Sequence, residues 1–234
     1  MVLDELVARS SRGDRTTRTA ATFWTDLLTS EGHPLATDLP DENLIDWHRR
    51  DLLGHLNGKR VLDVGCGGGR NSRWFAEQGA LVDGIDIAGD LLDRARPFMP
   101  TEVTLVVHDV LRDQLPHDEY DVVYDSGCFH HLAPHRRETY LQRVLPAVVR
   151  GGHFGIVTFE ADKIDSLTDA EIIASGDVGG GIGYSLDDLV EIFDSLEPTE
   201  TRAVRQGTEG AFGVDFLNAA LFRSTRDTSC RREP

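Results

Sequence analysis

Short apolar runs recur along the chain and are separated by stretches with helical spacing. The run at 61–64 places Val61, Leu62 and Val64 around a single aspartate, which is typical of a central parallel strand covered on both faces. Similar runs follow at 80–87, 103–108, 120–125 and 153–159, and two later ones lie at about 197–205 and 214–223. This pattern predicts one α/β domain, with the two late strands forming an antiparallel edge.

Two amphipathic segments precede the first strand. Apolar residues recur at helical spacing in 19–29, and a second helical segment begins at Asp41, a favourable N-cap residue, and ends at Asn57-Gly58. We expect these two helices to form a lid over the carboxyl edge of the sheet. The stretch from 160 to 183 has little periodicity and ends in a run of glycines, so we expect a flexible loop there.

A glycine-rich turn follows the first strand and precedes a helix. The turn has the pattern Gly65-x-Gly67-x-Gly69 and is preceded by Asp63. A phosphate-binding P-loop would end in Gly-Lys-Ser or Gly-Lys-Thr, and a dinucleotide turn would have Gly or Ala where this chain has Arg70. A ligand lying over the turn would meet backbone N–H groups at a helix start.

Asp86 ends the second predicted strand, roughly 20 residues after the glycine turn. An acidic residue at this place in a nucleotide-binding sheet accepts hydrogen bonds from ribose hydroxyls. Ile87 would then pack against an adenine ring.

A second distinctive phrase follows the fourth predicted strand, Asp125-Ser-Gly-Cys-Phe-His-His-Leu132. Together with the glycine turn and Asp86, it resembles the class I methyltransferases that use S-adenosylmethionine. Within that family it is similar to a bacterial small-molecule branch near the tellurite-resistance and thiopurine types. The resemblance covers roughly residues 20 to 225. It implies an α/β, Rossmann-like, seven-stranded mixed sheet with the last strand antiparallel, helices on both faces and an N-terminal helical lid.

The same resemblance implies a role for each matching residue. The methionine part of S-adenosylmethionine would lie near Asp63, Gly65, Cys66 and Gly67, the ribose on Asp86, the adenine by Ile87, Asp109 and Val110, and the sulfonium against the backbone of Asp125 and Ser126. Asp109 has a competing interpretation as a helix or turn cap. The product would be S-adenosylhomocysteine.

The methyl acceptor needs positioning and, for a protonated nucleophile, a base. His131, or else His130, is the candidate base, because both lie on the loop that should face the methyl group. The alternative is that this pair only packs or hydrogen-bonds within the loop. Position alone suggests four substrate contacts, Trp47, Phe129, Glu160 and Tyr184. His135 and Asp125 do not complete a recognised ligand spacing, so we expect no metal.

The composition of the chain limits the classes of molecule that we expect it to bind. The 234 residues carry a formal net charge of −16, which argues against nucleic acid, and no long apolar run predicts a membrane span. Three scattered cysteines and the absence of a basic leader at the start favour a reducing, cytoplasmic location. We expect a small-molecule substrate and a monomer or homodimer.

The expected organisation has a mobile segment at 1–18, one domain at 19–225 and a disordered tail at 226–234. The domain would contain a helical lid at 19–57, a cofactor-binding core at 58–160, a flexible substrate loop at 161–185, and a C-terminal helix and strands at 186–225. The expected function is methyl transfer to N or O, possibly S, of a small metabolite or natural product. Two alternatives stay open: a protein that binds S-adenosylmethionine without methylating, for example one that steers a cyclisation, and an NAD-dependent oxidoreductase.

Overall fold

The computed structural model describes residues 15–16, 20–30, 32, 36–207 and 209–225. The expected mobile segment, apart from Arg15 and Thr16, and the expected tail lie outside the described residues. Within the described part of the chain, no helix is both long and apolar enough to cross a membrane.

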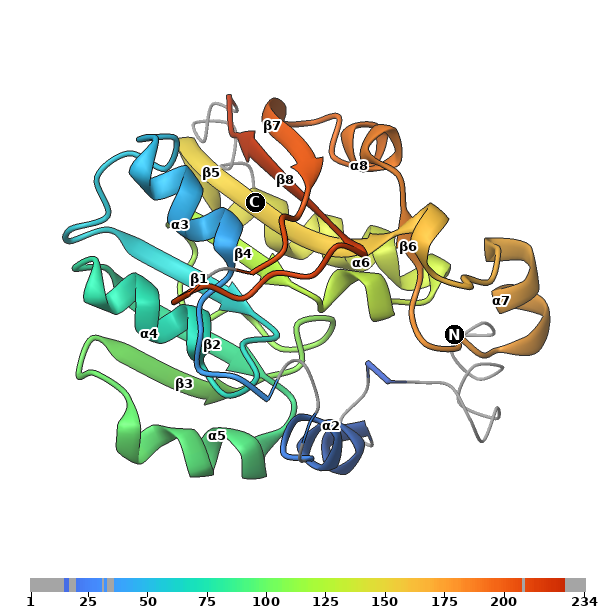
Figure 1. Ribbon diagram of the computed structural model, residues 1–234, viewed down its shortest axis with the longest axis horizontal. Helices are drawn as coiled ribbons and strands as arrows, with labels where there is room; N and C mark the ends of the chain where they lie inside the picture. The colour runs from blue at the N-terminus through green and yellow to red at the C-terminus, as the bar shows by residue number, and fades with distance from the viewer. Residues whose placement is uncertain (1–14, 17–19, 31, 33–35, 208, 226–234) are drawn as a thin grey trace, which may run out of the picture.

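One mixed sheet organises the molecule, with the strand order β3-β2-β1-β4-β5-β8-β7 (Figure 1). The strands are β1 (Arg60–Val64), β2 (Leu81–Asp86), β3 (Val103–Val107), β4 (Tyr120–Ser126), β5 (Val148–Glu160), β6 (Gly183–Tyr184), β7 (Glu197–Ala203) and β8 (Leu217–Arg223). The first five strands pair in parallel, whereas β8 runs antiparallel to both β5 and β7. The predicted Rossmann-like sheet with an antiparallel last strand is confirmed, and the two-residue β6 adds an eighth strand beside β5.

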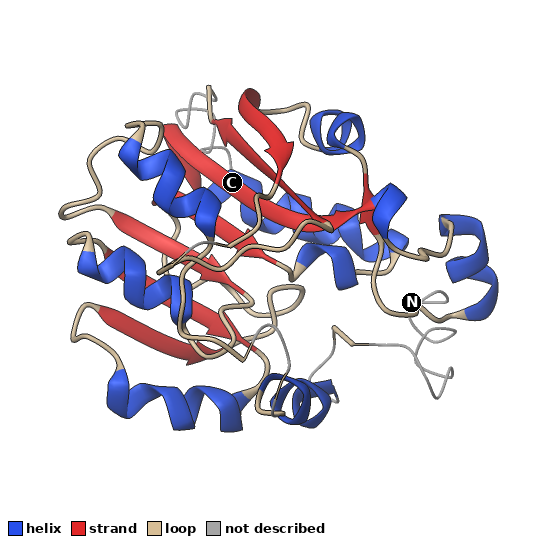
Figure 2. Cartoon of the chain, viewed as in Figure 1, coloured by secondary structure: helices blue, strands red, loops and turns tan. Residues whose placement is uncertain are grey.

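Helices cover both faces of the sheet (Figure 2). The α-helices of the described residues are α2 (Ala21–Leu28), α3 (Glu42–Arg49), α4 (Arg70–Glu77), α5 (Gly89–Ala95), α6 (Pro134–Val144), α7 (Asp169–Ser175) and α8 (Leu186–Ile192). Trp74 and Phe75 on α4 are buried, as their spacing predicts. Ser185 caps α8 through a reciprocal pair of hydrogen bonds with Asp188, which the sequence also predicts.

Strand residues alternate between two hydrophobic clusters because successive side chains point to opposite faces. Val61 packs with α3 and α4 on one face, while Leu62 packs with α6 and α8 on the other. The same alternation places Val122 on the first face and Val123 on the second. The two faces are therefore fixed by a period of two, and the site lies where these strands end.

Two segments differ from the secondary structure that the sequence predicted. The second N-terminal helix ends at Arg49 rather than at Asn57-Gly58, and Asp51 follows with a left-handed φ of 59°. Residues 161–185, where we expected a flexible loop, contain α7, with a capping box at Thr168, and β6. Thr168 lies three residues before Glu171, a spacing in the sequence that would have predicted this cap.

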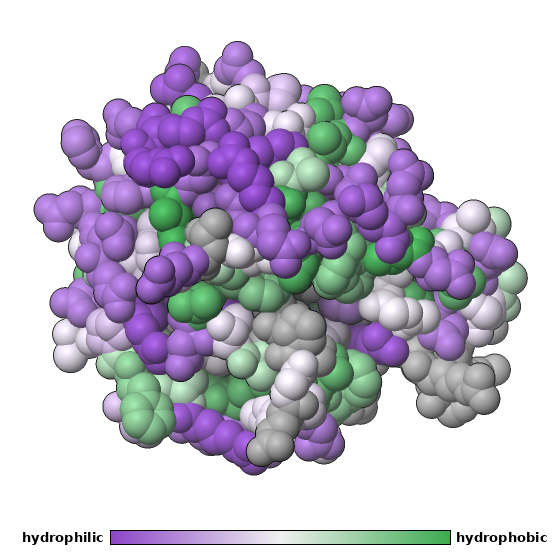
Figure 3. All heavy atoms as spheres, viewed as in Figure 1, coloured by the Kyte–Doolittle hydropathy of each residue, from purple (hydrophilic) through white to green (hydrophobic). Residues whose placement is uncertain are grey.

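The helix α3 is part of the core rather than a lid. Leu44 and Trp47 are fully buried against the sheet. Arg202 on β7 donates two hydrogen bonds to Glu42, of 2.5 and 3.0 Å. In the space-filling view, hydrophilic side chains gather over α3 and beside β7 (Figure 3). Only α2, of the two N-terminal helices, lines the pocket.

Candidate active site

A pocket of about 530 Å³ opens at the carboxyl ends of the parallel strands. The glycine turn after β1, the end of β2 and the loop after β4 form its floor, and α2 forms one wall. Its volume lies within the range of about 300–1,000 Å³ that small-ligand sites have. Ligands of open α/β sheets bind at this edge, between strands whose connections run in opposite directions.

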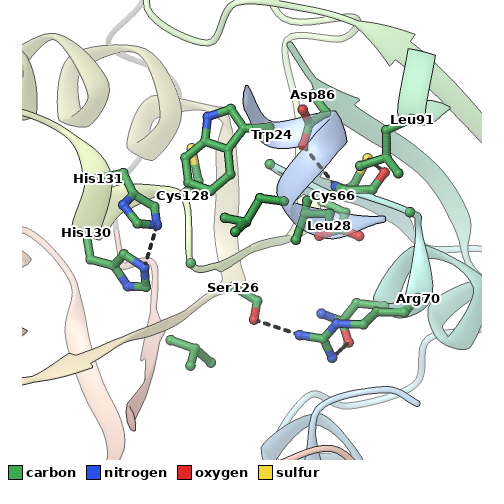
Figure 4. A pocket seen from close by; sticks show the side chains of 18 of the residues that line it. Trp24, Leu28, Cys66, Arg70, Asp86, Leu91, Ser126, Cys128, His130 and His131 are labelled. Carbon is green, nitrogen blue, oxygen red and sulfur yellow. Dashed lines mark hydrogen bonds between the residues drawn. The ribbon is translucent and has the colours of Figure 1, made fainter. Parts of the chain in front are cut away.

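Asp86 fixes the backbone of the glycine turn. One carboxylate oxygen accepts the Gly67 N–H at 2.9 Å, and the other accepts the Ala88 N–H at 2.8 Å (Figure 4). Burial raises the pKa of Asp86, and these N–H groups oppose the rise by stabilising the carboxylate. Each oxygen keeps a lone pair for a further donor. The carboxylate lies in the pocket wall, where the sequence predicted it.

The glycine turn requires glycine at its first position. Gly65 has φ 66°, and a Cβ there would lie 2.7 Å from the Cβ of Cys128. Gly65, Cys66 and Gly67 all line the pocket. The structure therefore brings the turn and the loop after β4 into direct contact.

An apolar end of the pocket lies beyond Asp86. Ile87 and Val110, both predicted, line it together with Leu91 and His108. Asp109 does not line it. Its side chain is buried and accepts the Leu111 N–H at 3.0 Å, so it caps a turn, as its competing interpretation held.

Asp63 lies beneath the turn and reaches the pocket. The Ser72 hydroxyl donates a hydrogen bond of 2.5 Å to it. Burial raises the pKa of Asp63 to about 7, although the bond from Ser72 and the charge of Arg70 lower it. The carboxyl group therefore holds its proton to a higher pH than an exposed aspartate does.

Asp125 shapes the loop after β4 rather than lining the pocket. One oxygen accepts the N–H groups of Cys128 and Phe129, at 2.8 and 3.2 Å, and the other accepts the Tyr140 hydroxyl at 2.6 Å. The next residue, Ser126, does line the pocket. Asp125 thus holds the loop so that Ser126 faces the ligand space.

The predicted base does not fit the geometry of the histidine pair. His130 Nδ1 accepts the Phe159 N–H at 3.2 Å, and His130 Nε2 lies 3.1 Å from His131 Nε2 (Figure 4). The remaining nitrogen, His131 Nδ1, is buried without a hydrogen-bond partner. Burial lowers the pKa of His130 to about 3 and places the pKa of His131 well below its usual range. The rings line the pocket, but three of their nitrogens are engaged and the fourth is inaccessible, which fits the alternative interpretation of a loop contact.

None of the four suggested substrate contacts lines this pocket. Trp47 is fully buried in the core, and its indole N–H donates to Glu200. Phe129 is fully buried and packs against Tyr184, with ring centroids 5.5 Å apart. Glu160 faces Lys163 at 3.7 Å. Strand ends carry side chains to both faces of a sheet, so position along the sequence could not identify the pocket side.

Sequence reasoning missed the apolar wall of the pocket. Phe212, Val214 and Phe216 all line it from the segment before β8, and Trp24, Leu27 and Leu28 line it from α2. The alternation of apolar residues from 212 to 216 is visible in the sequence. It could have indicated an extended segment with one apolar side, whereas the predicted strand began only at Val214.

Arg70 was also missed, although its sequence position excluded a dinucleotide turn. It is the first residue of α4 and lines the pocket, and its Nη1 pairs with Asp41 at 2.7 Å. Its Nη2 donates to Ser126 Oγ at 3.3 Å. Asp41 comes from the N-terminal segment, a partner that local sequence does not reveal.

The residues present suit an adenosyl ligand. A carboxylate with free lone pairs stands beside an apolar slot, and Gly68, where an added Cβ would meet nothing within 4 Å, keeps the turn open. Among the described residues, no group of three or more His, Cys, Asp or Glu side chains could hold a metal ion.

This sheet order, glycine turn and acidic strand end are those that the resemblance to the class I S-adenosylmethionine-dependent methyltransferases implies. A family model described as a methyltransferase domain matches residues 61–152, from β1 into β5. This part of the chain is therefore a methyltransferase domain of that class, and the cofactor of the class is S-adenosylmethionine.

Curated relatives match the same part of the chain. An uncharacterized methyltransferase of Synechocystis is 33% identical over 102 residues, which are 43% of this chain and 47% of that protein. A ubiquinone biosynthesis O-methyltransferase of Bordetella avium is 43% identical over 83 residues, 36% of this chain and 32% of that protein. The chain thus spans about half or less of the length of these relatives.

Solved structures share the fold over most of the chain. Magnesium protoporphyrin IX methyltransferase from Synechocystis, with bound S-adenosylhomocysteine, has a TM-score of 0.61 at 19% identity and covers 90% of this chain and 96% of its own. A 1,6-didemethyltoxoflavin-N1-methyltransferase from Burkholderia thailandensis has a TM-score of 0.58 at 19% identity, covering 89% and 85%. TehB from Haemophilus influenzae has a TM-score of 0.57 at 17% identity, covering 86% and 67%.

Proposed function

We propose that the protein transfers the methyl group of S-adenosylmethionine to an N or O atom of a small molecule. The observation that carries this proposal is the shape of the pocket. We call the part lined by Asp86 and the glycine turn, against which Leu28 of α2 also lies, the polar half, and the part lined by Trp24 and the 212–216 segment the apolar half. Two ligands that meet at Ser126 would fill these halves.

The polar half is our candidate cofactor site. Asp86 would accept from the ribose hydroxyls, and Ile87 and Val110 would hold the adenine ring. The turn from Gly65 to Gly67, above Asp63, would hold the methionine part. The bound cofactor supplies an activated methyl group on a positively charged sulfur, so the protein need not create an electrophile.

The apolar half is our candidate acceptor site. Its walls would orient the acceptor atom toward Ser126 and exclude water, and such positioning can lower a barrier by several kcal/mol. One pocket of about 530 Å³ would have to hold both ligands, which favours a small acceptor. The relatives named for ubiquinone and didemethyltoxoflavin methylation support a small molecule of this kind.

In the reaction, the sulfur–methyl bond would break as the bond from the methyl group to the acceptor forms. We assign no protein base to this step, because neither histidine offers an accessible nitrogen with a useful pKa. We propose that the histidine pair instead ties the loop after β4 to β5.

Calorimetric titration with S-adenosylmethionine, S-adenosylhomocysteine and NAD tests the cofactor assignment. Both adenosyl ligands should bind wild type, and Asp86→Asn should weaken them at least tenfold because it replaces a charged acceptor, a loss of about 1.4 kcal/mol or more. Asp90→Asn, on the exposed side of α5, is the matched control and should leave the affinity unchanged.

Binding of NAD in preference to the adenosyl ligands would overturn the proposal in favour of an oxidoreductase. Tight adenosyl binding without S-adenosylhomocysteine formation, across a library of small N and O acceptors, would instead indicate a protein that binds the cofactor without methylating.

A further inference from the structure

The guanidinium of Arg70 enters the pocket at the end opposite to the histidine pair (Figure 4). Its Nη1 is fully engaged, by Asp41 at 2.7 Å and the Leu39 carbonyl at 3.1 Å. Its Nη2 turns toward Ser126 Oγ, 3.3 Å away. The Nη1 side of the guanidinium therefore binds other parts of the protein, and the Nη2 side faces the ligand space.

Arg70 is oriented before any ligand arrives. Its partner Asp41 is buried and also accepts from the Tyr124 hydroxyl at 2.7 Å and from Asn71 Nδ2 at 2.9 Å. The guanidinium carbon lies 4.8 Å from the centre of the Phe212 ring. A donor held in this way loses little conformational freedom when a ligand binds.

Ser126 adds a second donor. Because its oxygen accepts from Arg70, its O–H is left to donate to a group in the pocket. Arg70 Nη2 and Ser126 Oγ therefore present two donors to one point, at the carboxyl end of β4. Donors that converge in this way suit a negatively charged oxygen, and a charged partner strengthens the hydrogen bonds.

Aromatic and aliphatic side chains line the same pocket. Phe212, which lies against the Arg70 guanidinium, Val214 and Phe216 line it from the segment before β8, and Trp24 lines it from α2. Aromatic side chains favour a flat ring that can lie against them. A ligand of this shape would place a substituent at the arginine end while its ring fills the slot.

We propose that the methyl acceptor is a flat ring bearing an anionic oxygen, a carboxylate or an ionised acidic hydroxyl, which binds Arg70 Nη2 and Ser126 Oγ. This inference rests on the proposed function, since it assigns the substrate class of the same site. It does not depend on which atom of the ring system accepts the methyl group.

Ligand binding to the complex with S-adenosylhomocysteine tests the substrate class separately from activity. The probes are one- to three-ring aromatic carboxylates, each paired with its neutral methyl ester, titrated by calorimetry. At least one carboxylate should bind at least tenfold more tightly than its ester. If every ester binds as well as its carboxylate, the inference fails while the cofactor assignment stands. If S-adenosylhomocysteine itself does not bind, the proposed function fails first.

Variants of Arg70 and Ser126 test whether these two residues cause the preference for the carboxylate. Ser126→Ala and Arg70→Gln should each reduce the preference for the carboxylate at least threefold, and Arg70→Lys should retain part of it. Arg73→Gln is the matched control, because Arg73 lies one turn further along α4 and pairs with exposed Asp38. Ser126→Ala leaves the pair between Arg70 and Asp41 in place, so it tests the site even if Arg70→Gln unfolds. An unchanged preference in folded Ser126→Ala and Arg70→Lys would overturn the inference.

A second source of the anion is the carboxylate of the cofactor itself. S-adenosylhomocysteine carries this group, whereas 5′-methylthioadenosine lacks it. Arg70→Lys and Ser126→Ala should weaken both ligands equally or not at all. A selective loss of S-adenosylhomocysteine affinity would assign the two donors to the cofactor and overturn the substrate proposal.

Discussion

His130 and His131 lie on the loop where a base was expected, and their hydrogen bonds decide what they do. Because the Phe159 N–H occupies His130 Nδ1, a neutral His130 carries its proton on Nε2 and donates it to His131. His131 then carries its own proton on Nδ1, which has no accessible surface. The hydrogen bonds therefore run in one direction, from the Phe159 N–H of β5 to His130 and from His130 to His131.

Both rings should stay neutral in the folded protein. Burial lowers the pKa of His130 to about 3, and that of His131 well below its usual range. NMR of the ring carbons, with His130→Gln and His131→Gln used for assignment, should show no protonation of either ring from pH 8 down to about pH 5. A midpoint near 6.5 for either residue would contradict the geometry and restore the candidate base.

Asp63 should make the ligand-free protein less stable as pH rises. Its folded pKa of about 7 lies above the usual value of 3.8, so the folded state binds more protons than the unfolded state between these values. Stability from this group is therefore present at low pH and is lost as pH rises toward 7.

Asp63→Asn removes this pH dependence while keeping an acceptor for Ser72. Relative to wild type, the free energy of unfolding of this variant should increase from pH 4 to above pH 7, by on the order of 4 kcal/mol at most. Urea unfolding at several pH values measures the difference. A pH-independent difference would show that Asp63 ionises normally in the folded state.

At the level of elements, the sequence predicted what short-range pattern controls. The strands, the glycine turn and the cap of α8 all follow from residues within a few positions of one another. It did not reveal that Asp41 reaches Arg70 and Tyr124, or that Phe212 forms the pocket wall, because these contacts join residues far apart in the chain. The same limit explains why Trp47 was expected in the pocket.

Substitutions of Trp47 and Trp24, which lie on successive helices of the chain, should have different effects on protein stability and on ligand binding. Trp47 on α3 is fully buried, so Trp47→Ala should cost about 3–5 kcal/mol of stability and leave pocket affinity unchanged in the molecules that remain folded. Trp24 on α2 lines the pocket beside His131, with ring centroids 4.7 Å apart. Trp24→Ala should therefore weaken ligand binding with a smaller loss of stability.

Urea unfolding and calorimetry on both variants test this division. If Trp47→Ala weakened ligand binding in the folded protein more than Trp24→Ala, the assignment of α3 to the core would be incorrect.

For the whole molecule, charge should control how fast an anionic acceptor arrives. The formal net charge of −16 repels an anion at long range, although the positively charged Arg70 lines the pocket. Salt screens this repulsion, because the Debye length falls from about 30 Å at 0.01 M to about 8 Å at 0.15 M.

The association rate constant of an aromatic carboxylate should therefore rise with salt over this range, while that of its methyl ester stays nearly constant. Stopped-flow fluorescence on the complex with S-adenosylhomocysteine measures both. A carboxylate rate that falls with salt would mean that a local positive field at the pocket mouth outweighs the charge of the whole chain.

The hydrogen bonds between Glu42 and Arg202 join residues 160 positions apart, and Phe212 pairs with Asp41 in a short parallel bridge. A contact this distant costs more loop-closure entropy than the neighbouring strand pairs of the cofactor half. On the ribosome, residues 42–49 leave the exit tunnel long before β7 and β8 exist. Trp47 therefore stays without its final partners while the strand–helix units behind it can already assemble. The proposed cofactor half can therefore form first, and the proposed acceptor half is completed only when the late strands pair and contact α3.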